Sequence, residues 1–386
     1  MRSFYKIVHT SARTVWGNTE KRILEESIWM KGQGHQVIVM APGNSPLILK
    51  AREQGLTAYE FSFRGLARIN EYSKLLQILY NEQPNVINAH GRTDAGMALK
   101  AAKKSGVACR IISRHTGKRL KKTLSNKNLY KKLSHYVFTT STDTCDHLKT
   151  LFHLSDMEIF SIPGSMVEPL ALAPKEAARK DLALGLELDP STQFLGFLRP
   201  PANPKKLKSI LRAFKLGSLP KSRHLIFTDK TLEHTREMII TAGKDLDISG
   251  QIHFHPPKPG RNWDVYRGID ACILMPGPHA LEGVPLEMIK AMYASCPIIG
   301  PGTPGIKDLL IHEKTGLCFD PDAPHTLSKM IQKTLDQEAA ALERTYAARN
   351  MVKKHYTMDA MGRDIIRIYR LHQVKMDRQF HPIPLI

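Results

Sequence analysis

The amino-acid sequence predicts an α/β protein of two doubly wound domains, each with a parallel sheet covered by helices. Three observations predict this class. Short apolar runs alternate with helical stretches along most of the chain, which is typical of parallel sheets covered on both faces. The alternation pauses once, near the middle. The 386 residues also exceed the size of one ordinary domain, about 100–200 residues. We expect the two domains to face each other across a cleft.

The first domain is expected to span residues 1–168. Its predicted strands are the short apolar runs 5–9, 36–40, 58–61, 86–89, 110–113 and 136–140. Helical stretches separate them, the clearest at 19–33 and 95–104, and Gly34 stands where a glycine commonly ends a helix. This beginning is the strand-helix-strand unit from which parallel sheets are built.

The second domain is expected to span residues 190–355, after a linker at 169–189 in which prolines flank a short Ala/Lys/Arg helix. Its predicted strands are 194–198, 224–228, 251–254, 271–275 and 297–300. Its predicted helices are 205–216, 231–242, 285–294 and 325–335. Beyond Glu338 the sequence is helical almost to Val374, and we expect the last segment, 356–386, to cross back to the first domain as a C-terminal helix.

The chain is strongly basic. Its 56 Lys and Arg against 36 Asp and Glu give a net charge of +20, and such a field attracts nucleic acids, anionic lipids or nucleotide-activated metabolites. No zinc-finger, RNP or basic-heptad motif accompanies the charge, which disfavours a nucleic-acid partner. No apolar run of membrane-spanning length and no signal peptide is visible, so we expect a cytoplasmic protein. The five cysteines are scattered and never form a Cys-x-x-Cys pair, which disfavours a disulfide framework or a zinc site.

One segment, 100–132, concentrates the basic charge: it holds twelve Lys and Arg and no Asp or Glu. The simplest interpretation is a solvated face. The alternative is docking to an anionic membrane, to which each surface Lys or Arg contributes about 1 kcal/mol. Apolar side chains among the basic residues would then contact the lipid: Leu120, Leu124, Leu129, Tyr130 and Leu133.

The first candidate binding loop follows the strand at 5–9. Gly17 and Asn18 open the next helical stretch, and a glycine there leaves backbone N–H groups near the helix N-terminus free to bind a phosphate or a sugar hydroxyl. The alternative is simple N-capping of the helix by Asn18 or Thr19.

The second candidate loop, residues 282–286 with the sequence EGVPL, lies between a predicted strand and a predicted helix. Pro285 suits the first helical position, and Gly283 permits close approach of a ligand. The Glu282 carboxylate can accept hydrogen bonds from sugar hydroxyls. The alternative is that Glu282 only caps the helix and complements its dipole.

Several short motifs follow one another along the chain. They are Gly17-Asn-Thr, Gly34-His-Gln-Val, Asn88-Ala-His90-Gly, Ser113-Arg-His115, Ser161-Ile-Pro163-Gly164, Gly196-Phe-Leu-Arg199 with Lys205, Glu282-Gly-Val-Pro-Leu, Cys296-Pro-Ile-Ile-Gly and Thr315-Gly316. Together they closely resemble the family-4 (group 1) glycosyltransferases of the GT-B fold. The resemblance covers most of the chain and implies two Rossmann-like domains.

The resemblance implies how a nucleotide-sugar donor is bound. Arg199 and Lys205 would neutralise the diphosphate, because the leaving nucleoside diphosphate gains charge as the glycosidic bond breaks. Glu282 would bind hydroxyls of the donor sugar. Further donor contacts would come from Gly283, Val284, Pro285, Leu286 and Lys290.

The same resemblance places His115 near the donor sugar, and Gly17, Asn18 and His90 on the acceptor side. The expected catalytic residues are His115, Glu282, Arg199 and Lys205. The reaction would retain anomeric configuration and need no metal or other cofactor. The acceptor would be a saccharide or glycolipid of a bacterial envelope polysaccharide such as lipopolysaccharide, reached from the cytoplasmic face of an anionic inner membrane.

One departure from the family concerns ribose. The family usually has a second Glu eight residues after Glu282, where it holds the donor ribose, whereas this chain has Lys290. Ribose recognition must then differ, or Lys290 contributes its charge to a phosphate instead. The departure keeps two alternatives open: a catalytically silent relative that binds a glycan or a nucleotide-sugar, and a nucleotide-sugar epimerase on the same fold.

Overall fold

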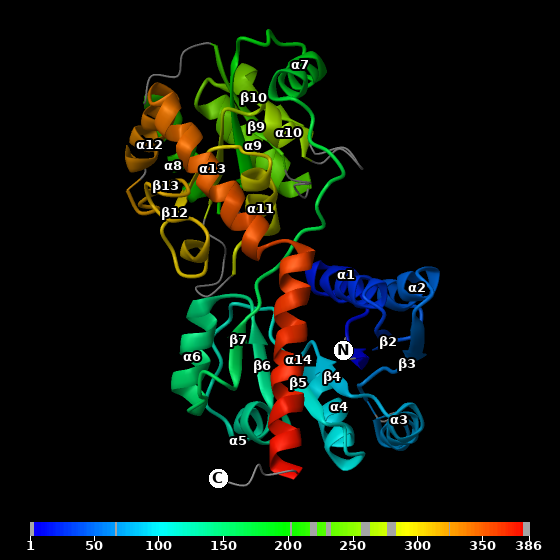
Figure 1. The fold of residues 1–386 in the computed structure, drawn as a ribbon. Coiled ribbons are helices and arrows are strands. Elements are labelled where there is room, and N and C mark those ends of the chain that lie inside the picture. Colours follow the sequence, from blue (N-terminus) through cyan, green and yellow to red (C-terminus); the bar gives the residue numbers. More distant parts are fainter. Residues whose placement is uncertain are drawn as a thin grey trace. The chain divides into compact units, whose positions relative to one another are not determined.

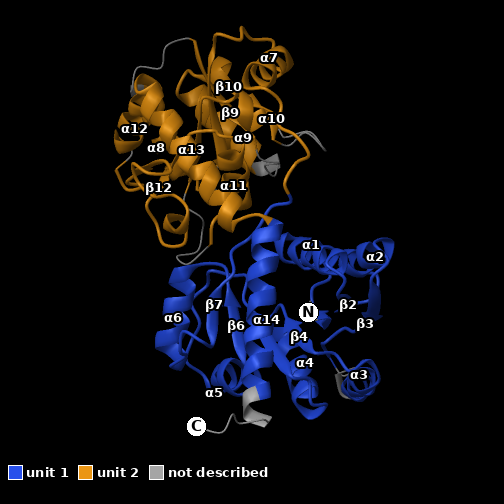
Figure 2. Ribbon diagram, viewed as in Figure 1, with its two compact units in different colours: residues 1–167, 358–386 blue, residues 168–357 orange. Residues whose placement is uncertain are grey.

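The computed structural model describes two compact units, coloured separately in Figure 2. Unit 1 comprises Met1–Val167 and Met358–Ile386, and unit 2 comprises Glu168–Thr357. Each unit is built around its own parallel sheet (Figure 1), which confirms the predicted α/β class. The described residues are 4–65, 68–200, 203–216, 222–228, 233–255, 263–275, 283–323 and 325–380.

Unit 1 has a seven-stranded parallel sheet with the strand order β3-β2-β1-β4-β5-β6-β7. Its strands are β1 (Lys6–Thr10), β2 (Gln36–Ala41), β3 (Thr57–Glu60), β4 (Val86–Ala89), β5 (Cys109–Ser113), β6 (Tyr136–Thr139) and β7 (Ile159–Ser161). The chain adds β2 and β3 on one side of β1 and then returns to add β4 on the other. The strand order therefore reverses between β1 and β4, and such a switch point is where doubly wound sheets bind ligands.

Helices cover both faces of this sheet. They are α1 (Asn18–Gly32), α2 (Pro46–Glu53), α3 (Arg68–Glu82), α4 (Arg92–Lys104), α5 (Leu124–Lys127), the π-helix η1 (Asn128–Leu133), α6 (Thr142–Phe152) and α14 (Met358–Phe380). Successive strand residues point to opposite faces and so belong to different cores. Val8 packs in the core that includes Ala98 of α4, and Ile7 packs in the core that includes Ile23 of α1 and Tyr369 of α14.

Helix α14 is the last helix in the sequence but packs within unit 1. Its first residue, Met358, donates a backbone hydrogen bond to Met166 O at 2.8 Å. Ile365 and Tyr369 are fully buried among residues of α1 and the sheet. The helix that the sequence predicts from Glu338 almost to Val374 is therefore interrupted at Tyr356 and Thr357, because the chain leaves unit 2 at this point.

Unit 2 has a six-stranded parallel sheet with the strand order β10-β9-β8-β11-β12-β13. Its strands are β8 (Gln193–Arg199), β9 (Arg223–Phe227), β10 (Ile252–Phe254), β11 (Ala271–Leu274), β12 (Ile298–Pro301) and β13 (Leu317–Phe319). Its helices are α7 (Lys175–Gly185), α8 (Pro204–Leu216), α9 (Glu233–Asp245), η2 (Ser249–Gln251), α10 (Asp264–Gly268), α11 (Leu286–Tyr293), η3 (Ile306–Asp308), α12 (His325–Asp336) and α13 (Glu338–His355). Here the strand order reverses between β8 and β11.

The segment 169–189, which the sequence predicts to be a linker, contains α7 and belongs to unit 2. Ala178 and Leu182 of α7 are buried. Arg179 forms a salt bridge with Asp270, with Nη1 2.7 Å from Oδ1. A Cβ on Gly268 of α10 would come within 2.9 Å of Ala178 O, so α7 and α10 pack backbone to backbone.

Among the described residues, no helix combines the length and the hydropathy that crossing a bilayer requires.

Candidate active-site residues at the two switch points

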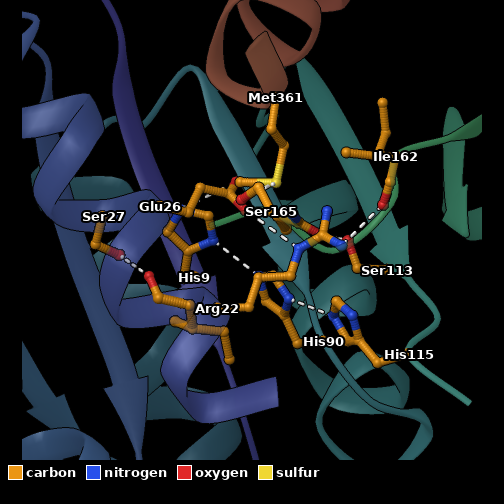
Figure 3. Close-up of polar contacts among 12 residues, drawn as sticks. His9, Arg22, Glu26, Ser27, His90, Ser113, His115, Ile162, Ser165 and Met361 are labelled. Atoms are coloured by element: carbon orange, nitrogen blue, oxygen red, sulfur yellow. Dashed lines mark hydrogen bonds and ion pairs between the residues drawn. The ribbon is translucent and has the colours of Figure 1, made fainter. Parts of the chain in front are cut away.

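Three histidines meet at the switch point of unit 1 (Figure 3). His9 lies in β1, His90 directly follows β4, and His115 follows β5. His9 Nδ1 is 2.9 Å from His90 Nε2, and His90 Nδ1 is 2.9 Å from His115 Nε2. The three side chains meet because β1, β4 and β5 are neighbours in the sheet. The imidazoles therefore form one hydrogen-bonded chain, which contains the predicted residues His90 and His115 and adds His9.

The surroundings keep the three imidazoles neutral. His9 and His90 are buried, and His115 is partly buried. Burial, helped by the charge of Arg22, lowers the pKa of His9 to about 3. Burial and nearby positive charge also hold the pKa of His90 and of His115 well below the usual range. The ring nitrogens of the three histidines bond one another. They therefore do not point together at one place where a metal ion could bind. Among the described residues, no group of three His, Cys, Asp or Glu is arranged to hold a metal ion.

Helix α1 places a buried charged pair beside the histidine chain. Arg22 Nη1 donates to Ile162 O at 2.8 Å, and Arg22 Nε lies 3.9 Å from Glu26 Oε2. Glu26 Oε1 lies 3.8 Å from His9 Nε2, and neither carboxyl oxygen of Glu26 has a hydrogen-bond partner among the described residues. Burial raises the pKa of Glu26 to about 7, against the lowering effect of Arg22. Glu26 belongs to none of the motifs found in the sequence.

A buried carboxyl group also closes the N-terminal turn of α4. Asp94 Oδ2 accepts hydrogen bonds from Thr10 Oγ1 at 2.7 Å and from the backbone N of His90 at 3.1 Å. A Cβ on Gly91 would come within 2.7 Å of Asp94 Oδ1, so a larger residue there would displace the Asp94 carboxyl group. Asp94 thus fixes the end of β1 relative to the residue that carries the central imidazole.

Gly17 and Asn18 lie at the N-terminus of α1. Gly17 is the N-cap residue, with extended backbone, and no side chain caps the helix. The interpretation of Asn18 or Thr19 as the capping residue is therefore wrong. A Cβ on Gly17 would come within 3.2 Å of Glu20 Oε2, and Glu20 is itself held by Arg13, whose Nε lies 3.1 Å from Oε1.

Unit 2 places two of the predicted donor-binding residues around the end of β8. Arg199 is the last residue of that strand and pairs with Leu274, the last residue of β11. Lys205 lies in the first turn of α8 with an exposed side chain. Asn203 Oδ1 accepts a hydrogen bond from the backbone N–H of Lys205 at 2.9 Å. The N-terminus of α8 is therefore capped by Asn203, and the side chain of Lys205 takes no part in the cap. The side chain of Arg199, and Glu282 as a whole, lie outside the described residues.

The described part of the second candidate loop leads into α11. Pro285 is the N-cap residue of this helix, and no side chain caps it. The expectation that Pro285 occupies the first helical position is therefore off by one residue, because Leu286 begins the helix. Val284 and Pro285 are buried, whereas Gly283 and Leu286 are partly buried.

Lys290, which stands where the family has its second Glu, lies in α11. Its Nζ is 5.5 Å from the ring centroid of Trp263, a distance at which an ammonium group is attracted by an aromatic face. Lys290 therefore makes a cation–π contact within unit 2.

Replacing Lys290 by Glu should lower the free energy of unfolding by about 0.5–2 kcal/mol, because the contact with the Trp263 ring is lost. Chemical denaturation measures this change. Lys314→Glu is the control, since Lys314 is exposed in the same unit and its replacement should change stability by less than about 0.5 kcal/mol. Equal losses in both variants would show that the ring contact does not stabilise the protein.

The apolar residues predicted to contact a membrane lie mainly inside unit 1. Leu129, Tyr130 and Leu133 are 3–7% exposed and belong to its core, so the prediction is wrong for these three. Leu120 packs partly against the same core. Leu124 alone of the five is exposed, at 87%. The basic side chains Lys118, Arg119, Lys121 and Lys122 are exposed.

The chain matches two family descriptions in succession. Residues 19–164 match "Glycosyltransferase Family 4", and residues 187–351 match "Glycosyl transferases group 1". No curated protein matches the chain. Among solved structures, a glycosyltransferase from Rickettsia africae has a TM-score of 0.79 at 15% sequence identity, covering 96% of this chain and 98% of that one.

Two further structures are similar. HepE of Anabaena in complex with UDP-glucose has a TM-score of 0.71 at 12% identity, covering 94% of this chain and 98% of that one. The lipopolysaccharide outer core galactosyltransferase WaaB has a TM-score of 0.69 at 15% identity, with the same coverage.

The two parallel sheets, each with candidate residues at its switch point, define a GT-B type α/β protein. The chain belongs to the family-4 (group 1) glycosyltransferases, whose two family descriptions it matches in order along its length.

Proposed function

We propose that the protein transfers a sugar from a nucleotide-sugar donor to a saccharide or glycolipid acceptor. The observation that carries the proposal is the switch point of unit 2. Arg199 ends β8, Lys205 follows in the first turn of α8, and the loop at 283–285 leads into α11. Two cationic residues, together with a helix N-terminus that no side chain caps, suit a diphosphate group. The complex of HepE with UDP-glucose supports the same class of donor.

Each residue then has a role that follows from the charge that develops during transfer. Arg199 and Lys205 stabilise the leaving nucleoside diphosphate, which is more negative in the transition state than in the bound donor. Glu282 accepts hydrogen bonds from the donor sugar, and the backbone of Gly283 to Leu286 adds donors. His115 lies against the donor sugar, and Gly17, Asn18 and His90 serve the acceptor side. The reaction proceeds with retention and without a metal ion.

The finer assignment is an envelope polysaccharide of the lipopolysaccharide type, with a hexosyl or heptosyl group transferred. The similarity to the galactosyltransferase WaaB and the basic charge support it. A nucleotide-sugar epimerase would act without a second saccharide, and a silent relative would bind a donor or glycan without releasing product. Lys290 is the residue that favours the silent relative.

A binding screen tests the donor class first. Thermal shift of the full chain is measured with a panel of nucleotide-sugars and with the corresponding free nucleosides. We expect at least one nucleotide-sugar to raise the melting temperature, and Lys205→Ala to reduce that rise. If no nucleotide-sugar binds at millimolar concentration, the transferase proposal fails.

The basic surface of unit 1 contains a cavity of about 390 Å³. A glycolipid acceptor would bring this surface to an anionic membrane. Arg92, Lys100 and Ser125 are among the residues that line the cavity. Arg92 Nε donates to Asn126 Oδ1 at 3.1 Å, a neutral partner that leaves its charge uncompensated. Asp94 is the one acidic residue between 84 and 142, and it is buried. The cavity therefore suits a phosphate carried by the acceptor or its lipid.

Changing Lys118, Arg119, Lys121 and Lys122 together to Gln should reduce cosedimentation with anionic vesicles, because each exposed basic residue contributes about 1 kcal/mol near such a surface. Binding of the unchanged protein should also fall as salt is raised, since exposed charges are screened over about 10 Å at 0.1 M ionic strength.

The control removes the same charge from unit 2, by Gln at the exposed residues Lys314, Lys329, Lys353 and Lys354, and should leave binding unchanged. Equal binding to neutral and anionic vesicles, or no binding to either, would show that the segment 100–132 is a solvated face and does not dock to a membrane.

A further inference from the structure

The histidine chain in unit 1 has an inner end and an outer end. Its inner end is His9 Nε2, which lies 3.8 Å from Glu26 Oε1. Its outer end is His115, the one partly exposed member of the three. Figure 3 shows the two hydrogen bonds between them, with Glu26 beside His9.

The proton positions along this chain are coupled. A neutral imidazole carries one proton, so one nitrogen donates and the other accepts. Each of the two bonds between rings holds one proton. If His9 donates through Nδ1, His90 must donate through Nδ1 to His115, which then carries its own proton on Nδ1. If His115 donates through Nε2, the order is reversed and all three protons lie on Nε2.

Glu26 is placed to select between these two arrangements. Neither of its carboxyl oxygens has a hydrogen-bond partner among the described residues. The distance to His9 exceeds hydrogen-bond length, so an ionised Glu26 acts on His9 through its charge and favours the proton on Nε2. A protonated Glu26 loses that preference, and a movement of its side chain toward His9 would let it donate a hydrogen bond to Nε2.

We propose that Glu26 is a positioning residue that determines, through His9 and His90, which nitrogen of His115 carries the proton. When Glu26 ionises, the cluster loses one proton. Each imidazole keeps its single proton, which moves from Nδ1 to Nε2. His115 Nδ1 then presents a lone pair, whereas below the pKa of Glu26 it presents an N–H donor. Under the proposed function, on which this consequence rests, the ionised state makes His115 an acceptor for a substrate hydroxyl.

The charged groups around Glu26 determine the pH at which this change occurs. Arg22, on the same helix, lowers the pKa of Glu26 and so favours its ionised form, while burial raises that pKa to about 7. Tyr369 of α14 lies close enough for Glu26 to raise its pKa, so it stays protonated. From α4, Asp94 bonds Thr10 and the backbone of His90 rather than an imidazole. Arg13 adds positive charge near His115.

Nitrogen-15 NMR of protein labelled at histidine tests the proposal without any sugar donor, so its outcome is independent of the transferase test. Two-bond correlation spectra distinguish a protonated from a bare ring nitrogen, and His115→Gln identifies the signals of His115. We expect the proton of His115 to shift from Nδ1 to Nε2 as the pH rises, with a midpoint near about 7, the pKa of Glu26.

Two variants locate the origin of the shift. Glu26→Gln should abolish the pH dependence, and His90→Gln should abolish it by interrupting the chain. Glu20→Gln is the control, because Glu20 is the other buried carboxyl of α1 and faces Ser11 and Arg13, so the pH dependence should remain. A His115 proton that stays on one nitrogen throughout, or one that shifts equally in Glu26→Gln, would overturn the proposal.

Discussion

Alanine at Arg199 or Lys205 should lower turnover about 30- to 1000-fold, which corresponds to about 2–4 kcal/mol of lost transition-state stabilisation. Under the proposed function, both residues would neutralise the charge that builds on the leaving diphosphate. Lys205 is exposed, and its helix is capped by Asn203, so the loss should not reflect unfolding. Glu282→Ala, outside the described residues, should have an effect of the same size.

Steady-state kinetics with the donor found by the binding screen measures these losses. Lys206→Ala is the matched control, since Lys206 is exposed on the next position of α8 and should keep nearly full turnover. If Lys205→Ala and Lys206→Ala lose turnover equally, the effect comes from the general positive charge of α8. That result would contradict the specific role proposed for Lys205.

Alanine at Gly362 should lower the free energy of unfolding by about 1–3 kcal/mol, the usual cost of overpacking a close contact. Gly362 lies in α14, and a Cβ there would come within 2.4–2.6 Å of three atoms of the Trp29 ring. Trp29 is held in place by a hydrogen bond from Nε1 to Asp359. The substitution should therefore push α14 away from α1.

Chemical denaturation compares this variant with Gly32→Ala, in which the new Cβ meets no atom within 4 Å and stability should not fall. In a Trp29→Leu background the cost of Gly362→Ala should shrink, because the smaller side chain leaves room. A full cost in that background would show that the clash with the ring is not its cause.

The fold was predictable because alternation between apolar strands and helices is a local pattern. The strands β7 and β13, each of only three residues, were missed. The helix α7 was taken for part of a linker because prolines flank it where the alternation pauses, and only its packing against α10 assigns it to unit 2. Leu129, Tyr130 and Leu133 were misplaced because a π-helix breaks the spacing by which a buried helical face is recognised.

The candidate site was predictable only in part. His90 and His115 could be named one by one from their motifs, but their bond to each other and to His9 depends on the order of β1, β4 and β5. Glu26 gave no signal, because an Arg and a Glu four residues apart on a helix usually form a surface pair. Its burial follows from the packing of α1 between the sheet and α14, which residue spacing alone does not reveal.

The most direct test of the transferase function is the release of nucleoside diphosphate from the donor selected by the binding screen. The full chain is incubated with that nucleotide-sugar and a panel of saccharide and glycolipid acceptors, and product is followed by mass spectrometry. We expect nucleoside diphosphate and a glycosylated acceptor to appear in equal amounts, with Arg199→Ala strongly slowed. Binding of the donor without any release, or conversion of the donor to an epimer with no acceptor consumed, would contradict it.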